Sequence, residues 1–184
     1  MSNLSQFAGA SSVPAKSTTY TSGSGTFTPL VASKWLYVTL VGGGGGGSTP
    51  VAIWTNGPSG NSGAYASYWL QVATPGTTTY SYAVGAGGAG TSDYVYSVGS
   101  DGTATTFGTL TSVGGPAAAA ASPAATNGQS NPFGSGGKQG STYSSLHGQA
   151  GTGYGSGGGG SASNGSIPYK SGAGAGGLLI VLEY

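Results

Sequence analysis

The chain has 184 residues, of which 40 are glycine, none is cysteine, four are basic and three are acidic. This length suits one domain, and the lack of cysteine excludes disulfides and thiolate metal sites. The sparse charge excludes the basic surface that nucleic-acid binding needs. No stretch approaches the roughly 20 apolar residues of a membrane span, and residues 1–17 lack the regions of a signal peptide. We therefore expect a protein made in a cytoplasm, with no cofactor, no metal, no nucleic-acid partner and no membrane insertion.

The chain opens with a polar segment of small residues that has no periodicity. We predict that residues 1–22 form an extended arm, which would be ordered only against a partner. Its few larger or conformationally restricted side chains are the candidates for attachment. These are Leu4, Phe7, Val13 and Pro14.

Strand patterns begin after residue 23. Residues 26–28 (TFT) predict a short strand, and residues 34–41 (KWLYVTLV) predict a long one. Leu36, Val38 and Leu40 alternate with other apolar or aromatic residues, so this strand is expected to be covered on both faces. It ends at six consecutive glycines, residues 42–47.

Two hairpins are predicted in the next part of the chain. Residues 64–72 and 77–84 alternate and are joined by Thr74-Pro75-Gly76, in the order that a type II turn prefers. Residues 103–107 and 109–113 predict a second hairpin around Gly108. An edge strand is predicted at 94–98, followed by a turn at Asp101-Gly102. The apolar residues 178–184 predict a terminal strand, placed beside residues 34–41.

The glycine-rich excursions cover residues 42–63, 85–93 and 114–177. A structureless loop of the last length is unusual inside a compact domain. Bare glycine can adopt a left-handed helix of three residues per turn without internal hydrogen bonds, and such helices can bond side by side. The alternative is that the runs are flexible linkers. We predict an all-β domain over 23–184: a small antiparallel β-sandwich-like framework with packed polyglycine-II-type segments and almost no helix.

Five blocks in order resemble the glycine-rich domains of tailed-bacteriophage tail fibres and tail-tip adhesins. They are residues 25–29 (GTFTP), 37–47 (YVTLV and its glycines), a central block of 63–66, 72–76 and 80–90 (ending in VGAGGAG), 102–108 (GTATTFG) and 172–184 (GAGAGGLLIVLEY). The resemblance implies attachment to a virion, a homotrimer and, in several relatives, recognition of the host surface. It departs from the family where Ser, Ala, Tyr and Pro interrupt the central glycines.

The motifs for enzymatic chemistry have simpler explanations. Residues 85–90 (GAGGAG) match a dinucleotide fingerprint, but a strand-like segment follows where a helix would be needed. Asp93 and Asp101 could form a glycosidase pair, yet both stand beside turn-like segments. No nucleophile elbow accompanies the single histidine, His147. We therefore expect no enzyme.

Aromatic and polar residues within the excursions are the candidates for receptor binding, because such residues on a rigid scaffold are typical of binding surfaces. The alternative is that the rings fill gaps between glycine helices or subunits. The candidates are Trp54, Asn56, Phe133, Tyr143, His147, Tyr154 and Tyr169.

The sequence leaves two main functions open. The first is a virion protein of the tail fibre or tail tip that presents loops to a host glycan or outer-membrane protein, with residues 1–22 bound to other virion proteins. The second is a purely structural protein that decorates or cements a capsid or tail. A surface-binding or ice-binding protein outside phages would need a flat threonine-rich face, and the threonine spacing here is irregular.

Overall fold

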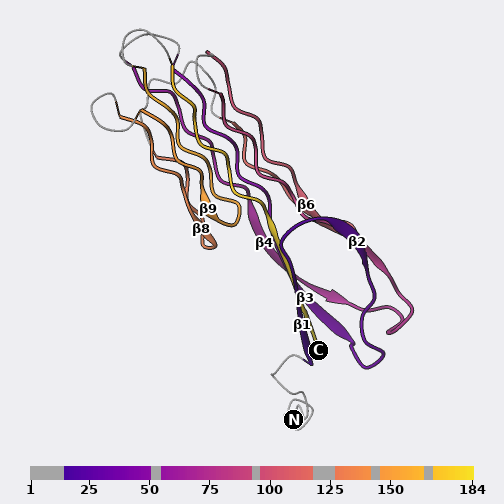
Figure 1. Ribbon diagram of the computed structural model, residues 1–184. Helices are drawn as coiled ribbons and strands as arrows, with labels where there is room; N and C mark the ends of the chain where they lie inside the picture. Colours follow the sequence, from indigo (N-terminus) through magenta and orange to yellow (C-terminus); the bar gives the residue numbers. More distant parts are fainter. Residues whose placement is uncertain (1–14, 51–54, 93–95, 118–126, 142–145, 164–167) are drawn as a thin grey trace, which may run out of the picture.

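The molecule has two parts arranged along one long axis (Figure 1). The computed structural model describes residues 15–50, 55–92, 96–117, 127–141, 146–163 and 168–184. Antiparallel β-sheets and the C-terminus occupy one end, and a bundle of extended segments occupies the other. The described residues contain strands and no helix, which confirms the all-β prediction.

The first sheet has the strand order β1-β10-β3-β4, and every pair in it is antiparallel. The prediction that the terminal strand lies beside residues 34–41 is therefore confirmed. One strand comes from the expected arm: residues 16–20 pair with the C-terminal strand, and residues 1–14 lie outside the described residues. The strands are β1 (Lys16–Tyr20), β3 (Trp35–Val41), β4 (Tyr65–Gln71) and β10 (Leu178–Glu183).

The second sheet has the order β2-β5-β6-β7. The predicted hairpin of residues 64–72 and 77–84 is wrong, because β4 pairs with β3 while β5 pairs with β2 and β6 in the other sheet. The turn at Gly76 is present, with φ of 79°, but the chain changes sheets after it. The strands are β2 (Ser24–Phe27), β5 (Tyr80–Ala83), β6 (Thr105–Phe107) and β7 (Leu110–Ser112).

The hairpin predicted around Gly108 is confirmed. β6 and β7 pair antiparallel, and Gly108 has the positive φ of 56° that favours glycine. The edge strand predicted at 94–98 is wrong for residues 96–98, which form no strand; residues 94 and 95 lie outside the described residues. The turn predicted at Asp101-Gly102 is also wrong, since the Gly102 amide donates to the Gly115 carbonyl at 2.9 Å within the bundle.

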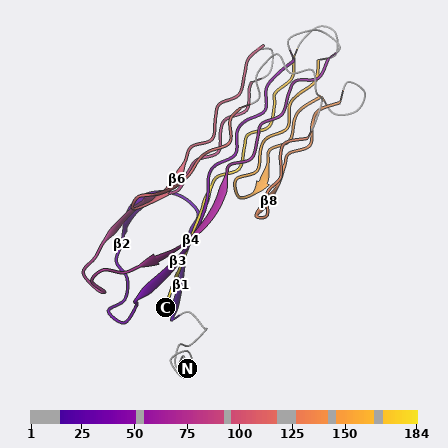
Figure 2. The same cartoon turned by 180° about the vertical axis from the view of Figure 1, so that it is seen from behind.

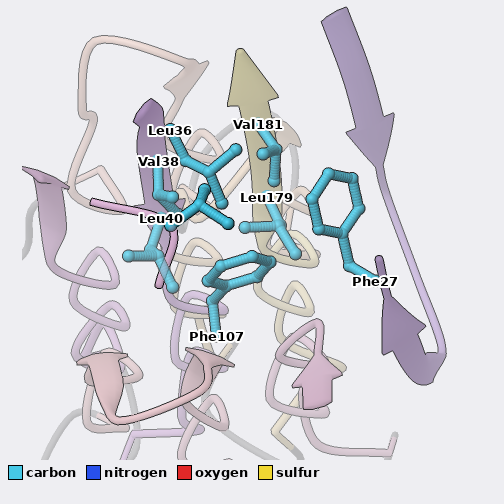
Figure 3. Packing of buried hydrophobic residues seen from close by; sticks show 8 residues of the cluster. Phe27, Leu36, Val38, Leu40, Phe107, Leu179 and Val181 are labelled. Atoms are coloured by element: carbon cyan, nitrogen blue, oxygen red, sulfur yellow. The ribbon is translucent and has the colours of Figure 1, made fainter. Parts of the chain in front are cut away.

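The apolar core lies between the two sheets (Figure 3). Leu36, Val38 and Leu40 alternate along β3 and are fully buried, as the pattern predicts. The rings of Phe27 and Phe107 close the core from the second sheet, with their centroids 5.6 Å apart. Burial of this cluster stabilises the β framework through the hydrophobic effect.

The other face of β3 is covered only at one end. Thr39 and Val41, next to the bundle, are buried, whereas Trp35 is 43% exposed. The prediction that this strand is covered on both faces is therefore wrong at its start, where Trp35 is exposed. The second sheet packs on one face of the first sheet and supplies no cover for the opposite face.

The bundle is organised around the six-glycine run, which continues straight out of β3. Its amides donate with a strict period of three. Gly42, Gly45 and Ser48 donate to Ala64, Asn61 and Pro58, while Gly43, Gly46 and Thr49 donate to Thr103, Ser100 and Ser97. Gly44 and Gly47 donate to Ala175 and Gly172. Each third residue thus bonds the same neighbour, which is the geometry expected of a threefold helix without internal bonds.

Three further segments donate to this central run, so six segments surround it. The amides of Gly88, Gly115 and Gly158 donate to the carbonyls of Gly44, Gly43 and Gly45. A Cβ atom added at any of residues 42–47 would overlap the backbone of one of these three segments. None of these glycines has positive φ, which fits the left-handed polyproline-II form. We call this arrangement the glycine lattice, and it confirms the predicted polyglycine-II packing.

A second run, residues 155–163, is also buried along its whole length. Several outer segments carry glycine at the positions that face a buried run. For example, Gly57, Gly60 and Gly63 are spaced by three, and an added Cβ at each would meet the backbone of residues 42–50. The requirement is the same as in collagen, where only glycine fits the crowded axis. Figures 1 and 2 show these segments running side by side from both directions.

Candidate functional site

Three of the predicted receptor-binding residues lie around one point of the lattice, Ala162. Asn56 forms an antiparallel bridge with Ala162. The Tyr169 amide donates to the Ala162 carbonyl at 3.2 Å, and the Ala162 amide donates to the Leu146 carbonyl at 2.9 Å. Ala162 follows Ser161, which bonds Ser48 near the end of the central run. The lattice therefore gathers Asn56, His147 and Tyr169 at its end far from the sheets.

His147 and Tyr169 are in direct contact, although they are far apart in the sequence. Their ring centroids are 5.2 Å apart with an interplanar angle of 86°, an edge-to-face arrangement. The contact follows from backbone pairing, because the Gly148 amide donates to the Lys170 carbonyl at 3.0 Å and the Gly151 amide donates to Ala173 at 2.9 Å. Two neighbouring lattice segments thus fix both rings.

A hollow of about 450 Å³ opens between these two segments. We call it the His147 hollow. Its walls combine a histidine, a glutamine and a lysine with small residues, among them Ser171, whose hydroxyl donates to the Gly47 carbonyl at 2.7 Å. It is lined by His147, Gly148, Gln149, Ala150, Lys170, Ser171, Gly172 and Ala173.

The charged residues that the structure describes near the hollow are positive. Lys170 lines it, and Lys138 lies on the adjoining segment, where its carbonyl accepts the Gln149 amide at 2.8 Å. Both acidic residues that the structure describes have other positions. Asp101 accepts from the Ala117 amide at 2.6 Å, and Glu183 lies in the sheet beside Lys16. An anionic group in the hollow would therefore meet attraction with no described carboxylate on its walls.

Phe133 and Tyr154 lie elsewhere, at the end of the lattice next to the sheets. The Tyr154 amide donates to the Phe133 carbonyl at 3.0 Å, beside the short pair β8 (Gly134–Ser135) and β9 (Thr152–Gly153). The Phe133 ring packs on Tyr65 of β4, with centroids 5.4 Å apart. This ring fills a gap between lattice and sheet, so the gap-filling interpretation fits Phe133 better than receptor binding.

The remaining predicted site residues lie outside the described residues. These are Trp54 and Tyr143 of the excursions, and Leu4, Phe7, Val13 and Pro14 of the arm. The sequence reasoning missed Lys170 and Gln149 as wall residues. A signal was available in the three-residue glycine spacing at Gly148 and Gly151, which marks residues 147–151 as one lattice segment; Gln149, between these glycines, is exposed.

Residues 85–90, which match the dinucleotide fingerprint, already use backbone amides for hydrogen bonds within the fold. The Gly85 and Ala86 amides donate to the hydroxyls of Thr105 and Thr103, at 2.9 Å and 2.7 Å. The Gly88 amide donates to Gly44. A phosphate cradle needs such amides unpaired and directed at the ligand, so this segment cannot act as one in the folded protein.

The described ranges give no basis for a metal site or a membrane-spanning helix. There, no three His, Asp or Glu side chains come together as a metal site would require. Nor does that part of the chain contain a helix with the length and apolar character to cross a bilayer.

Comparison with known proteins identifies the family of the chain. No curated protein matches the chain. The sequence model of a family described as a glycine-rich domain matches residues 18–181, which takes in all strands from β2 to β9, the whole described lattice and most of β1 and β10. The chain therefore belongs to the glycine-rich domain family.

Proposed function

We propose that this protein is a bacteriophage virion protein of the tail fibre or tail tip, and that it binds the host surface through the His147 hollow. The observation that carries the proposal is the lattice-held group of His147, Gln149 and Lys170 around that hollow. In a chain with only four lysines and one histidine, two of these residues meet at one concave site. The resemblance to phage adhesins supplies the biological setting.

A cell-surface glycan with an acidic group is the ligand that this chemistry favours. The Gln149 amide can bond sugar hydroxyls, the His147 ring offers a flat surface, and Lys170 can pair with a carboxylate or phosphate. The lattice keeps the walls in place before binding, which lowers the entropic cost of association. One shallow site binds weakly, so several copies on a virion would act together through avidity.

Binding of purified protein to host cells and to an array of acidic and neutral glycans tests the proposal. Lys170→Ala should weaken binding to acidic glycans by roughly tenfold, which corresponds to about 1.4 kcal/mol. Lys34→Ala is the matched control, since Lys34 is an exposed lysine beside β3 with the same charge. Equal binding by the two variants would refute a role for the hollow.

The structural alternative is a decorating or cementing protein without a receptor. The partly exposed aromatic residues of the first sheet favour it, because large exposed apolar patches mark assembly surfaces. Immunogold labelling of virions locates the protein, and deletion of its gene tests its need. Loss of infectivity without any cell or glycan binding by the purified protein would favour this alternative.

A further inference from the structure

β4 is an edge strand whose outward backbone groups can be assigned. The Gly42 amide donates to the Ala64 carbonyl at 2.9 Å, and the Val72 amide donates to Lys34 at 3.0 Å. These bonds flank the pairs Val41–Tyr65 and Trp35–Gln71, so both pairs belong to the non-hydrogen-bonded type. By alternation, the groups that bond β3 come from Ala66, Tyr68 and Leu70.

The remaining residues of β4 direct their N–H and C=O groups away from β3. They are Tyr65, Ser67, Trp69 and Gln71, and none of their backbone groups has a hydrogen-bond partner among the described residues. Four consecutive outward positions therefore present a complete ladder edge. Such an edge is a template for another strand.

The other sheet edges carry the features that prevent strand addition. β1 carries Lys16 and is otherwise mostly serine and threonine, and β2 and β7 have only four and three residues. β4 has seven residues, no charge and no proline. Natural proteins protect exposed edges with lysine, proline or short length, and β4 has none of these.

We propose that β4 pairs antiparallel with β4 of a second copy of this chain, across a twofold axis at Tyr68. In that register Tyr65 faces Gln71 of the second copy, and Ser67 faces its Trp69. All four outward residues then form hydrogen-bonded pairs, so every open N–H and C=O finds a partner. The edge of β4 is self-complementary because its outward residues are placed symmetrically about Tyr68.

The side chains fit the same arrangement. The two Tyr68 residues would face each other directly, an aromatic pair that stabilises sheets. The two Trp69 rings would lie on one face at the diagonal spacing of about 7–8 Å, within reach of each other. Each Trp69 already packs on Tyr37 and Tyr184, with centroids 5.0 Å and 5.2 Å away, and is 59% exposed in the single chain. No charged residue lies on either strand, so the symmetry brings no like charges together.

This inference is independent of receptor binding, and its twofold symmetry differs from the threefold assembly that the phage resemblance implies. Light scattering coupled to size exclusion should give the wild-type protein twice the mass of the 17.5 kDa chain. Ser67→Lys should give the mass of one chain, because it places two lysines at the shared edge. Ser17→Lys, on the opposite edge β1 of the same sheet, should keep the double mass.

A crosslinking experiment tests the register and does not depend on Ser67→Lys folding. The chain has no cysteine, so Tyr68→Cys introduces a single thiol at the twofold axis. A directly opposite pair has its Cα atoms about 4.5–5.5 Å apart, which suits a disulfide. Mild oxidation should join Tyr68→Cys chains in pairs and leave Ser17→Cys chains single.

Four results would overturn the proposal. They are a wild-type mass of one chain, a double mass that Ser67→Lys leaves unchanged, a mass of three chains, and crosslinking of Tyr68→Cys no faster than that of Ser17→Cys. Circular dichroism of each variant confirms that the fold is retained in the comparison.

Discussion

Replacing Gly47 by alanine adds one methyl group at the centre of the glycine lattice. The new Cβ would lie 2.6 Å from the carbonyl carbon of Gly159 and 2.9 Å from the Gly160 amide nitrogen. Carbon atoms in contact normally stand about 3.5–4.0 Å apart. Gly159 belongs to the buried run 155–163, so it has no open space into which it can withdraw.

The size of the effect follows from the hydrogen bonds that a displacement of Gly159 would strain. A shift of about 1 Å would be needed to restore normal carbon contact. Gly159 donates to Gln149 at 2.9 Å and accepts from Gly172 at 2.7 Å. Overpacking costs about 1–3 kcal/mol, and each weakened hydrogen bond about 1 kcal/mol. We expect Gly47→Ala to lower the free energy of unfolding by about 3 kcal/mol, which at about 2–4 °C per kcal/mol lowers Tm by about 6–12 °C.

The matched control is Gly176→Ala, in the same lattice. Its added Cβ would meet only the Gly85 carbonyl oxygen, at 3.8 Å, which is ordinary contact. Gly176 has no positive φ, so we expect no loss, or a gain of about 0.4–1 kcal/mol from the less flexible unfolded chain. Calorimetry and urea unfolding of both variants measure the difference. If both variants unfold like the wild type, the lattice is not close-packed and the reasoning fails.

Two further predictions concern the β framework. Burial, followed by the charges of Tyr82 and Glu183, raises the pKa of Tyr20 above its ordinary value of 10.0. The folded state therefore holds this proton more tightly than the unfolded state does. This contributes to the free energy of unfolding below pH 10, and the contribution is lost as the pH rises above 10. Tyr20→Phe should reduce that alkaline slope in pH-dependent melting, and an unchanged slope would contradict the assignment. Glu183→Ala should destabilise by about 2–4 kcal/mol, because the buried carboxylate accepts from the Leu30 amide at 2.7 Å and the Ser33 hydroxyl at 2.9 Å. Glu183→Gln should lower the free energy of unfolding in urea by less, since its side-chain oxygen still accepts hydrogen bonds. Equal losses for the two variants would point instead to the ion pair between Glu183 and the partly exposed Lys16.

The sequence predicts elements well where side chains alternate. β3 follows from its alternating Leu36, Val38 and Leu40, β10 follows from its continuous apolar run, and their pairing follows from their shared apolar character. The failure of the 64–84 hairpin has a physical cause, because alternation shows which face of a strand is buried but not which strand it joins. Tyr82 packs on Tyr20 of the first sheet, with centroids 4.1 Å apart, a contact that no local pattern encodes.

The lattice is predictable in kind but not in detail. Six consecutive glycines indicate a threefold helix, yet they carry no side chains that select neighbours. Which segments surround residues 42–47 depends on the chain's connections and on the glycine spacing of the outer segments. The site shows the same limit. His147 and Tyr169 can both be nominated from composition, but their contact depends on the backbone bond between Gly148 and Lys170.

The glycine lattice also changes how the protein should respond to temperature. Unfolding an ordinary domain exposes mostly apolar surface, which raises the heat capacity, whereas exposure of polar groups lowers it. Here a large part of the interior is peptide backbone bonded to peptide backbone. We therefore expect the heat-capacity change of unfolding to be small for the length of the chain, and the stability curve to be broad and flat. The protein should therefore stay folded over a wide range of temperatures.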